Sequence, residues 1–547
     1  MMRFLTFVLL PTVSFAFDVI TATLDNANAR HDFNGNHFVG FNEGGSGPSI
    51  ENVTLPQNLA AVAALNPGTL RYPGGTHADY WDWRTGGCLP GLNKTLPGPL
   101  PSECKEYAKW PWTLEKFAQI IAHTNHHATP VFDLNVLTST PEEQVAMLQH
   151  ASTLGLPIKM VELGNEFYLC GKNFIKIFPT AASYAATANA YAIAIRHAFP
   201  RAQIAAVGGL FDGDNCGERR PTWDHGLDEG GLNTSLISAL TFHPYFIPGG
   251  NLSSLTNYTY GTLSQQQHEI AVLRADPGGF LGEPDAIYAD GRVAKMMQAQ
   301  LGRLGSLRRW VTEYNIIQWP GGPTQNPVFL SWAHALVVTA SALHLMRIPN
   351  LDTCMMHTLL NGWGWGAIFQ RKNGLYFLKG SGNEGPRPTT RFAKTASGWA
   401  LGLLSHTLQE MRTATPLVFA KSPTQQSWRP NSIMPTDPVA TYPVLLGAAF
   451  SRSSSTITAA PATSAAFVIN RAPNGLDVDV SRVFTGSAPV RVRLLTPACG
   501  AACGAAAWVA GPDDVANTTK LIAVGGSDGG QTLVTVPAFG IVALEQA

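Results

Sequence analysis

The chain has 547 residues, of which 45% are hydrophobic, so it is long enough to bury a large core in more than one domain. Its 37 lysines and arginines balance its 37 aspartates and glutamates. This balance supplies no basic surplus for nucleic acid or for an anionic membrane. We therefore expect neither nucleic acid nor a membrane as partner. Separately, we expect the protein to be a monomer.

The N-terminus has the pattern of a secretory signal peptide. Arg3 provides the positive end, an apolar stretch follows over residues 4–13, and Ser14 and Ala16 are the small residues that a signal peptidase reads. The alternative is a buried N-terminal strand. No later run of 18 apolar residues occurs. We predict cleavage after Ala16 and a secreted or luminal protein.

Glycosylation sequons and cysteines agree with that compartment. The six sequons begin at Asn52, Asn93, Asn233, Asn251, Asn257 and Asn517. Proximity suggests the pairs Cys88–Cys104, Cys170–Cys216 and Cys499–Cys503, although sequence does not fix connectivity, and Cys354 is expected to be a buried free thiol. No CxxC pair or histidine cluster has metal-site spacing, so we predict no metal and no cofactor.

Short apolar strands alternate with helical stretches between residues 38 and 408. The predicted strands are Phe38–Phe41, Thr69–Tyr72, Pro130–Leu134, Lys159–Leu163, Gln203–Val207, Ala239–His243, Arg309–Glu313 and Thr353–His357. Helices are predicted at Pro141–Leu154, Ala181–Ala198 and Pro327–Arg347, the last with Asn326 as its N-cap. This alternation predicts a (β/α)8 barrel. A doubly wound open sheet is the alternative, but the glycines at 44–47 lack the spacing of a phosphate-binding loop.

The amino-acid composition changes after residue 408. Ser, Thr, Pro and Ala become more frequent, and residues 409–440 have the composition of an irregular connector. Alternating runs then predict strands at Val444–Phe450, Ala465–Asn470, Leu476–Val480, Val490–Leu495, Lys520–Val524 and Thr532–Glu545. We therefore predict a signal peptide (1–16), an N-terminal strand (17–37) that joins a C-terminal β-sandwich (409–547), and a catalytic barrel (38–408).

Two glutamates stand at the carboxyl ends of predicted barrel strands, where the active sites of such barrels lie. Glu166 follows Asn165 at the end of the fourth strand, and Glu313 ends the seventh. A carboxylic acid and a carboxylate at one rim are what the cleavage of a glycosidic bond requires. We expect Tyr245 to hold the carboxylate of Glu313 and Asn165 to bind a sugar hydroxyl.

Other polar and aromatic residues at the same rim are candidate substrate contacts. They are Thr76, Asp79, Trp81, Asn135, His243, Tyr314 and Trp365. Glu43 is a competing carboxylate in a glycine-rich loop. Glu162 is expected to be a structural partner of Arg71, and Asp133 a salt-bridge partner inside the barrel.

These strand ends resemble those of known enzymes. The run from Val161 to Glu166 is similar to the Asn-Glu acid/base signature of the clan A glycoside hydrolases, and residues 310–314 resemble the nucleophile strand of that clan. Residues 132–137 resemble the heparanase and β-glucuronidase family (family 79), whereas residues 70–76 also resemble the α-L-arabinofuranosidases. The resemblance implies a retaining mechanism with Glu166 as acid/base and Glu313 as nucleophile. It implies a carbohydrate substrate, with a glucuronidase-like activity favoured and an arabinofuranosidase-like activity as the alternative.

Two other classes of protein are weighed against this hydrolase. A carbohydrate-binding protein on an inactive barrel would keep the aromatic residues but lose one glutamate, and both are present. A serine esterase needs a G-x-S-x-G turn between a strand and a helix. The pentapeptide at 525–529 fits the letters but leads into another predicted strand, which favours a hairpin turn.

Overall fold

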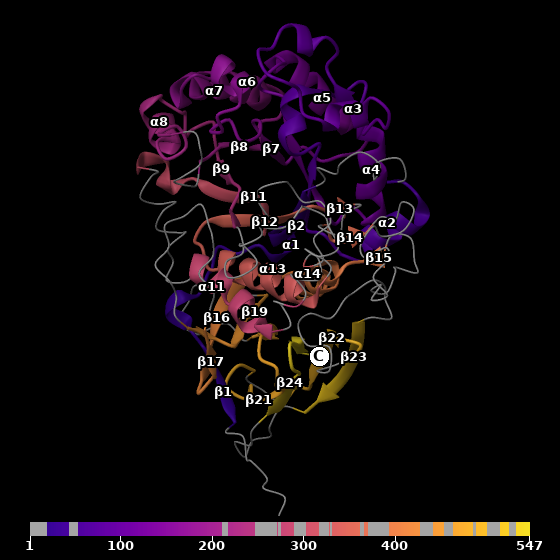
Figure 1. Ribbon diagram of the computed structural model, residues 1–547, viewed down its shortest axis with the longest axis vertical. Helices are drawn as coiled ribbons and strands as arrows, with labels where there is room; N and C mark the ends of the chain where they lie inside the picture. Colours follow the sequence, from indigo (N-terminus) through magenta and orange to yellow (C-terminus); the bar gives the residue numbers. More distant parts are fainter. Residues whose placement is uncertain are drawn as a thin grey trace, which may run out of the picture.

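The computed structural model describes most of the chain. It covers residues 19–42, 53–209, 217–246, 271, 275–288, 302–316, 328, 331–361, 366–369, 393–426, 441–452, 463–484, 488–499, 515–523 and 532–546. A barrel with surrounding helices forms the larger part, and a β-sheet layer lies at the opposite end from the helices α6 and α7 (Figure 1). The predicted signal peptide and the sequons at Asn52, Asn251 and Asn257 lie outside the described residues.

Parallel strands close into a barrel. In spatial order they are β2 (Val39–Asn42), β3 (Thr69–Tyr72), β6 (Thr129–Asp133), β7 (Met160–Glu162), β8 (Gln203–Val207), β9 (Ala239–Phe242), β11 (Arg308–Ile316) and β12 (Leu351–His357). The pairing of β11 with β9 on one side and β12 on the other closes the ring, and β12 returns to β2. The short strand β10 (Tyr245–Phe246) extends the pairing on β11. The predicted barrel and its strands are confirmed.

The interior of the barrel is layered. Val131, Met160, Ala205, Ala239, Trp310 and Met355 form one apolar cluster, with one residue from each of six strands. Side chains alternate along a strand, so the next inward residues lie two positions further toward the carboxyl end. On several strands these are polar: Asp133, Glu162, Thr312 and His357. The apolar layer therefore forms a floor beneath a polar rim.

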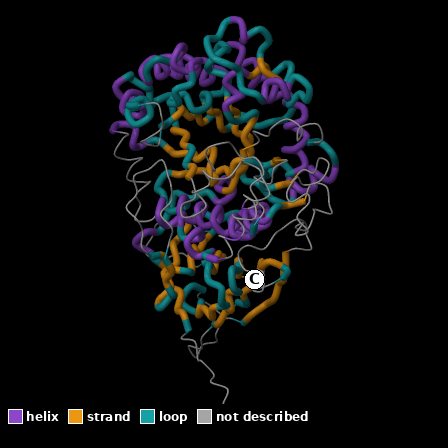
Figure 2. The backbone as a smooth tube through the Cα atoms, viewed as in Figure 1, coloured by secondary structure: helices purple, strands orange, loops and turns teal. Residues whose placement is uncertain are grey.

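Helices cover the outside of the barrel, and Figure 2 shows them around the central strands. They are α1 (Gly35–Phe38), α2 (Pro56–Ala63), α3 (Glu103–Tyr107), α4 (Leu114–His123), α5 (Pro141–Thr153), α6 (Lys172–Ile177), α7 (Ala181–Ala198), α8 (Trp223–Glu229), α10 (Pro277–Leu281), α11 (Glu283–Tyr288), α13 (Trp332–Leu345) and α14 (Ala396–Thr407). Within the described residues, no helix is both long and apolar enough to cross a membrane.

Helix α13 differs from its prediction at the N-terminus. It begins at Trp332, because the Ser331 side chain accepts a hydrogen bond from the backbone N–H of His334 and caps the helix. The predicted cap Asn326 lies outside the described residues. Every residue of α13 is buried, since the helix lies between the barrel and the sheet layer (Figure 1).

The sheet layer is a β-sandwich built from both ends of the chain. Its strand order is β23 (Val515–Ile522), β22 (Val490–Pro497), β25 (Ile541–Gln546), β20 (Ala465–Asn470), β19 (Leu445–Ser451), β16 (Thr413–Ala420), β1 (Ile20–Leu24), β21 (Leu476–Asp479) and β24 (Leu533–Val536). The strand β1 lies between β16 and β21. These strands enclose a second apolar core that includes Ile20, Val468 and Val534.

Two predictions for this layer were wrong. Residues 409–440 are not wholly irregular, because β16 pairs with both β1 and β19. The run 532–545 is two strands, β24 and β25, because the chain turns between them at Phe539, which has a positive φ of 47°. Short pairings also occur between β4 (Trp81–Asp82) and β5 (Gly87–Cys88), between β17 (Thr424–Gln425) and β18 (Tyr442–Pro443), and among β13 (Leu360–Asn361), β14 (Ile368–Phe369) and β15 (Ala393–Lys394).

The cysteines follow the predicted pattern where they are described. Cys88 and Cys104 form a disulfide, and Cys354 is a buried free thiol. Cys170 and Cys499 are also disulfide-bonded, with partners outside the described residues.

A buried ion pair joins the sandwich to the barrel. Arg471, which follows β20, pairs with Asp285 of α11 and donates to the carbonyl oxygens of Leu281 at 3.1 Å and Pro443 at 2.6 Å. The guanidinium lowers the pKa of Asp285 and thereby outweighs the burial that opposes its charge. We expect Arg471→Met to lower the free energy of unfolding by about 3–5 kcal/mol, because the Asp285 charge is left buried without the guanidinium that contacts it directly, and His344 lies further away at 3.5 Å.

Chemical denaturation measures that effect. Arg491→Met is the matched control, since the Arg491 side chain is 51% exposed and its pair with Glu545 is long, at 3.8 Å. Equal stability of the two variants would show that the buried pair does not hold the layers together.

Candidate active site

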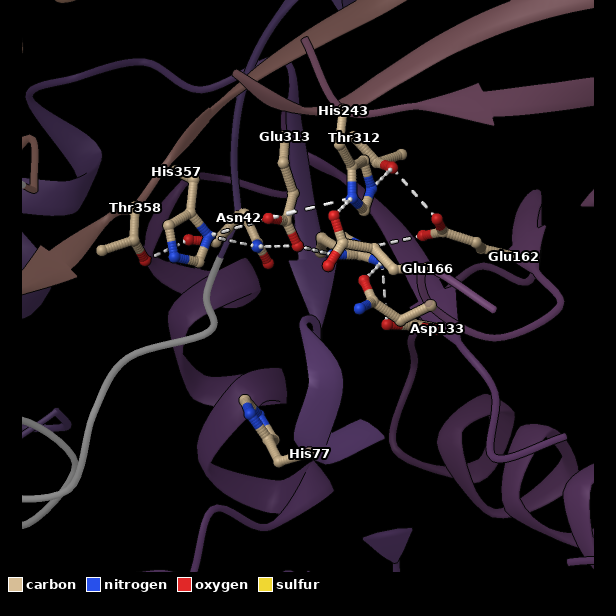
Figure 3. Close-up of polar contacts among 12 residues, drawn as sticks. Asn42, His77, Asp133, Glu162, Glu166, His243, Thr312, Glu313, His357 and Thr358 are labelled. Carbon is tan, nitrogen blue, oxygen red and sulfur yellow. Dashed lines mark hydrogen bonds and ion pairs between the residues drawn. The ribbon is translucent and has the colours of Figure 1, made fainter. Parts of the chain in front are cut away.

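The polar rim of the barrel gathers side chains from many strands. They are Asn42 of β2, Arg71 of β3, Asp133 of β6, Glu162 of β7, Glu166 after β7, His243 after β9, Tyr245 of β10, Thr312 and Glu313 of β11, and His357 of β12. Figure 3 shows most of them converging on Glu166 and Glu313. Glu166 and Glu313, predicted from strands far apart in the sequence, are therefore neighbours.

Glu313 reaches the interior through an irregularity in β11. The pairing of β11 with β12 shifts register between Val311 and Tyr314. Such a bulge interrupts the alternation of side chains. As a result the consecutive residues Thr312 and Glu313 both face the rim. There the Thr312 hydroxyl donates a hydrogen bond to Glu162, and Glu313 accepts one from Arg71.

Three donors hold the Glu313 carboxylate. Tyr245 donates its hydroxyl to Oε2 at 2.6 Å, Arg71 donates to Oε1 at 2.7 Å, and Asn42 donates to Oε1 at 3.0 Å. Burial favours the neutral acid, but His243, His357 and Arg71 together hold the pKa of Glu313 well below its usual range. Glu313 is thus an oriented anion, and the expected contact from Tyr245 is confirmed.

The chain turns sharply to present Glu166. Gly164 has φ of +91°, and a Cβ there would lie 2.3 Å from the Phe167 ring, so only glycine fits. Glu166 itself has a positive φ of 50°. A left-handed non-glycine residue costs on the order of 1 kcal/mol or more and is often found at a functional site.

Glu166 is more open than Glu313, with 19% of its side chain exposed against 7%. Its Oε1 accepts from the Tyr168 hydroxyl and contacts His243 Nδ1, each at 2.9 Å. Burial raises the pKa of Glu166 and the charge of Glu313 raises it too, but the hydrogen bond and charge of His243 lower it below its ordinary value. Conversely, burial lowers the pKa of His243, whereas Glu313 and Glu166 raise it above its ordinary value.

Glu166, His243 and Glu313 form a tight group. One ligand-type atom from each lies within 4.8 Å of the others, a spacing that a metal ion could also bridge. However, both ring nitrogens of His243 already have hydrogen-bond partners, Glu166 and Thr312. These contacts link His243 to both Glu166 and Thr312 by hydrogen bonds.

Arg71 neutralises much of the acidic charge. Its guanidinium contacts Glu162 at 2.6 Å, Glu313 at 2.7 Å and Asp133 at 2.9 Å, and its own side chain is fully buried. The expected roles of Glu162 and Asp133 as its partners are confirmed. Burial raises the pKa of Asp133 well above its ordinary value, and Arg71 only partly opposes this.

The oxygen and the nitrogen of the Asn165 side-chain amide differ in their hydrogen bonding. Its Oδ1 accepts from Arg71 at 2.9 Å, which fixes the amide orientation. Its Nδ2 donor is buried and has no hydrogen-bond partner among the residues that the structure describes. A buried amide donor of this kind is available to an oxygen of a bound molecule.

Four predicted contacts do not line the site. Trp81 is 2% exposed and packs edge-on against Tyr72 and Tyr107, so it offers no face to a sugar. Asn135 donates to Trp81 O and Thr138 and accepts from the backbone of Thr138, as a strand-end cap does.

The other two are displaced for different reasons. Asp79 is fully buried and accepts the backbone N–H of Asn165 at 3.0 Å, so it supports the loop. Tyr314 is 1% exposed and belongs to the apolar core that includes the outer helices, because the bulge leaves it on the opposite face from Glu313.

The remaining candidates have mixed outcomes. His243 lies in the site. Thr76 is half-buried and follows Gly75, where an added Cβ atom would lie 4.0 Å from Glu313 Oε1. Trp365 and Glu43 lie outside the described residues.

Sequence reasoning missed Asn42, His357 and Tyr168. Asn42 and His357 each end an apolar barrel strand, which is the same signal that identified Glu313. Tyr168 follows Glu166 by two residues, and no pattern in the sequence marked its hydroxyl as a partner of the carboxyl.

The fold is that of a (β/α)8 barrel with a C-terminal β-sandwich, and solved structures share it. The α-L-arabinofuranosidase of family GH51 from Thermotoga petrophila aligns with a TM-score of 0.61 at 16% identity, over 96% of this chain and 99% of that one. The GH51 arabinofuranosidase from Xanthomonas axonopodis pv. citri aligns with a TM-score of 0.60 at 16% identity, over 97% and 100%.

A 4-O-α-L-rhamnosyl-β-D-glucuronidase from Fusarium oxysporum has a TM-score of 0.56 at 13% identity, over 96% of this chain and 98% of that one. These neighbours belong to clan A, so the resemblance seen in the strand motifs is confirmed at the level of the fold. No protein-family model matches the sequence, and no curated protein matches it.

Proposed function

We propose that the chain is a retaining glycoside hydrolase with Glu313 as nucleophile and Glu166 as acid/base. The observation that carries this proposal is the spacing of the two carboxyl groups, which have oxygens within 4.8 Å of each other. Retaining enzymes hold their carboxyl groups about 5–5.5 Å apart, whereas inverting enzymes leave roughly 6.5–9.5 Å for a water molecule.

The environment of Glu313 suits a nucleophile, and Glu166 is the more open of the two carboxyl groups. Glu313, anionic and held by Tyr245, Arg71 and Asn42, attacks the anomeric carbon while Glu166 gives a proton to the leaving oxygen. The attack consumes the charge of Glu313, which had raised the pKa of Glu166. The pKa of Glu166 therefore falls in the covalent intermediate, which favours its carboxylate form. This carboxylate takes the proton of the water that releases the sugar.

The substrate classes are an α-L-arabinofuranoside and, second, a β-glucuronide. The strand-two run from Leu70 to Thr76 resembles the arabinofuranosidases, and four solved structures with TM-scores of 0.60 or 0.61 carry that name. The glucuronide stays a candidate because of residues 132–137 and the Fusarium oxysporum enzyme.

We also propose that the protein is secreted. The signal-peptide pattern of residues 1–16 supports this, as do the Cys88–Cys104 disulfide and the exposure of the sequon residues Asn93, Asn233 and Asn517.

A panel of aryl glycosides tests the activity. We expect turnover of the aryl α-L-arabinofuranoside or the β-glucuronide, with retention of anomeric configuration in the first-formed product by NMR. Inversion would contradict the retaining mechanism, and no turnover of arabinofuranosides, glucuronides, xylosides or glucosides would contradict the activity.

Glu166→Ala tests the acid/base role on the best substrate of that panel. We expect kcat/KM to fall about 10²- to 10⁴-fold with a poor leaving group and less with a good one, since the proton matters most for a poor leaving group. Azide should restore turnover and yield a glycosyl azide. Glu142→Ala, on the exposed face of α5, is the matched control. Equal losses with both leaving groups and no azide rescue would contradict the role.

A further inference from the structure

A chain of hydrogen bonds runs behind Glu166. Its Oε1 contacts His243 Nδ1 at 2.9 Å, and His243 Nε2 contacts Thr312 Oγ1 at 2.9 Å. The Thr312 hydroxyl continues to Glu162 Oε1 at 3.0 Å (Figure 3). All three links are of ordinary hydrogen-bond length.

The far end of this chain fixes its direction. Glu162 is fully buried and ion-paired with Arg71 through Oε2, so it is a carboxylate that only accepts. Thr312 must therefore donate its hydroxyl proton to Glu162 and accept with its lone pair from His243. That acceptance requires a proton on His243 Nε2.

We propose that Thr312 and Glu162 are positioning residues that keep a proton on Nε2 of His243, so that the proton His243 exchanges is the one between Nδ1 and Glu166. The inference rests on the proposed function, in which Glu166 is the acid/base. The Nδ1 proton passes to the Glu166 carboxylate and leaves a neutral imidazole and a neutral carboxylic acid. The acid protonates the leaving oxygen, and the proton taken from water in the second step returns to the pair.

The charges around His243 stabilise its protonated form. Glu166 and Glu313 raise the pKa of the imidazole, Arg71 opposes them, and His357 at the end of β12 is a further titratable neighbour. Loss of the Nδ1 proton would leave a nitrogen lone pair facing a carboxylate oxygen at 2.9 Å. His243 and Glu166 therefore titrate as a unit, and the basic limb of the kcat/KM profile reflects both groups.

Thr312→Val removes the acceptor for Nε2–H but keeps the shape of the side chain. His243 then loses its proton from Nε2, which faces the valine, and keeps Nδ1–H toward Glu166. We expect the basic limb of the kcat/KM profile to move to lower pH by about one to two pH units. Thr312→Ser should restore the wild-type profile. Thr353→Val, a buried barrel threonine bonded to Thr69 outside this chain, is the matched control.

The tautomer itself can be observed without substrate. In ¹⁵N-histidine-labelled protein, the His243 signals, assigned by their absence in His243→Gln, should show a protonated Nε2 throughout the titration. In Thr312→Val the neutral ring should carry its proton on Nδ1. An unprotonated Nε2 in the wild-type protein, or an unchanged basic limb in folded Thr312→Val, would overturn the inference. Absence of glycosidase activity would instead overturn the proposed function, because the NMR result does not depend on turnover.

Discussion

Glu313→Gln is expected to reduce kcat/KM by a factor on the order of 10⁴ to 10⁶, the range typical for loss of a catalytic nucleophile. The amide has almost the volume of the carboxylate but does not attack an anomeric carbon. Tyr245, Arg71 and Asn42 all donate to Glu313, so the variant loses charge at the centre of an oriented set of donors. Steady-state kinetics on the best aryl glycoside measure the loss.

Trapping gives an independent readout of the same role. A 2-deoxy-2-fluoro glycoside of the accepted sugar should add its mass to the wild-type protein at Glu313 and leave Glu313→Gln unlabelled. Glu142→Gln, on an exposed position, should react like wild type. Labelling of Glu313→Gln at another carboxylate, with turnover retained, would show that the nucleophile lies elsewhere.

Arg71→Met is expected to lower the free energy of unfolding by about 3–5 kcal/mol at neutral pH. Arg71 is the shared partner of Asp133, Glu162 and Glu313, and its side chain has no exposed surface. Without it these carboxylates lie buried near one another, and burial then favours their neutral forms. Thermal and chemical denaturation should show the loss.

The direction of the pH dependence follows from the same charges. Burial raises the pKa of Asp133 well above its ordinary value and Arg71 opposes this, so in Arg71→Met the folded-state pKa of Asp133 lies still further above its unfolded value and the folded state binds more protons. Its stability therefore increases as pH falls toward the unfolded pKa values, and the deficit relative to wild type narrows. Arg84→Met is the control, because the Arg84 side chain is 53% exposed in its pair with Glu143. A deficit that is the same at every pH would contradict the charge argument.

Much of the fold and the centre of the site could be predicted from local patterns. The strands β3 and β8 and the helix α7 have the predicted bounds, because their apolar spacing and flanking residues are clear. Glu166 and Glu313 were found because a carboxylate at an apolar strand end has few structural reasons to be there.

The errors came from features that no local pattern carries. The bulge in β11 reverses the face of Tyr314, and its register depends on the neighbouring strand β12. Trp81 looks like a stacking platform in sequence, but its burial depends on Tyr72 and on Tyr107 of α3. The strand β16 was missed because its pairing partners include β1, almost 400 residues away in the chain; one of its side-chain contacts, Thr23 to Val418, spans 395 residues.

The position of β1 has a consequence for biosynthesis. The ribosome releases residues 20–24 long before β16 and β21, the two strands that flank them in the sandwich. Until β16 and β21 have been synthesised, this segment has two unpaired edges, and an unpaired apolar strand is a site for aggregation. All the barrel strands precede β16 and β21 in the chain, so β1 remains without its two neighbours until the barrel strands have been synthesised.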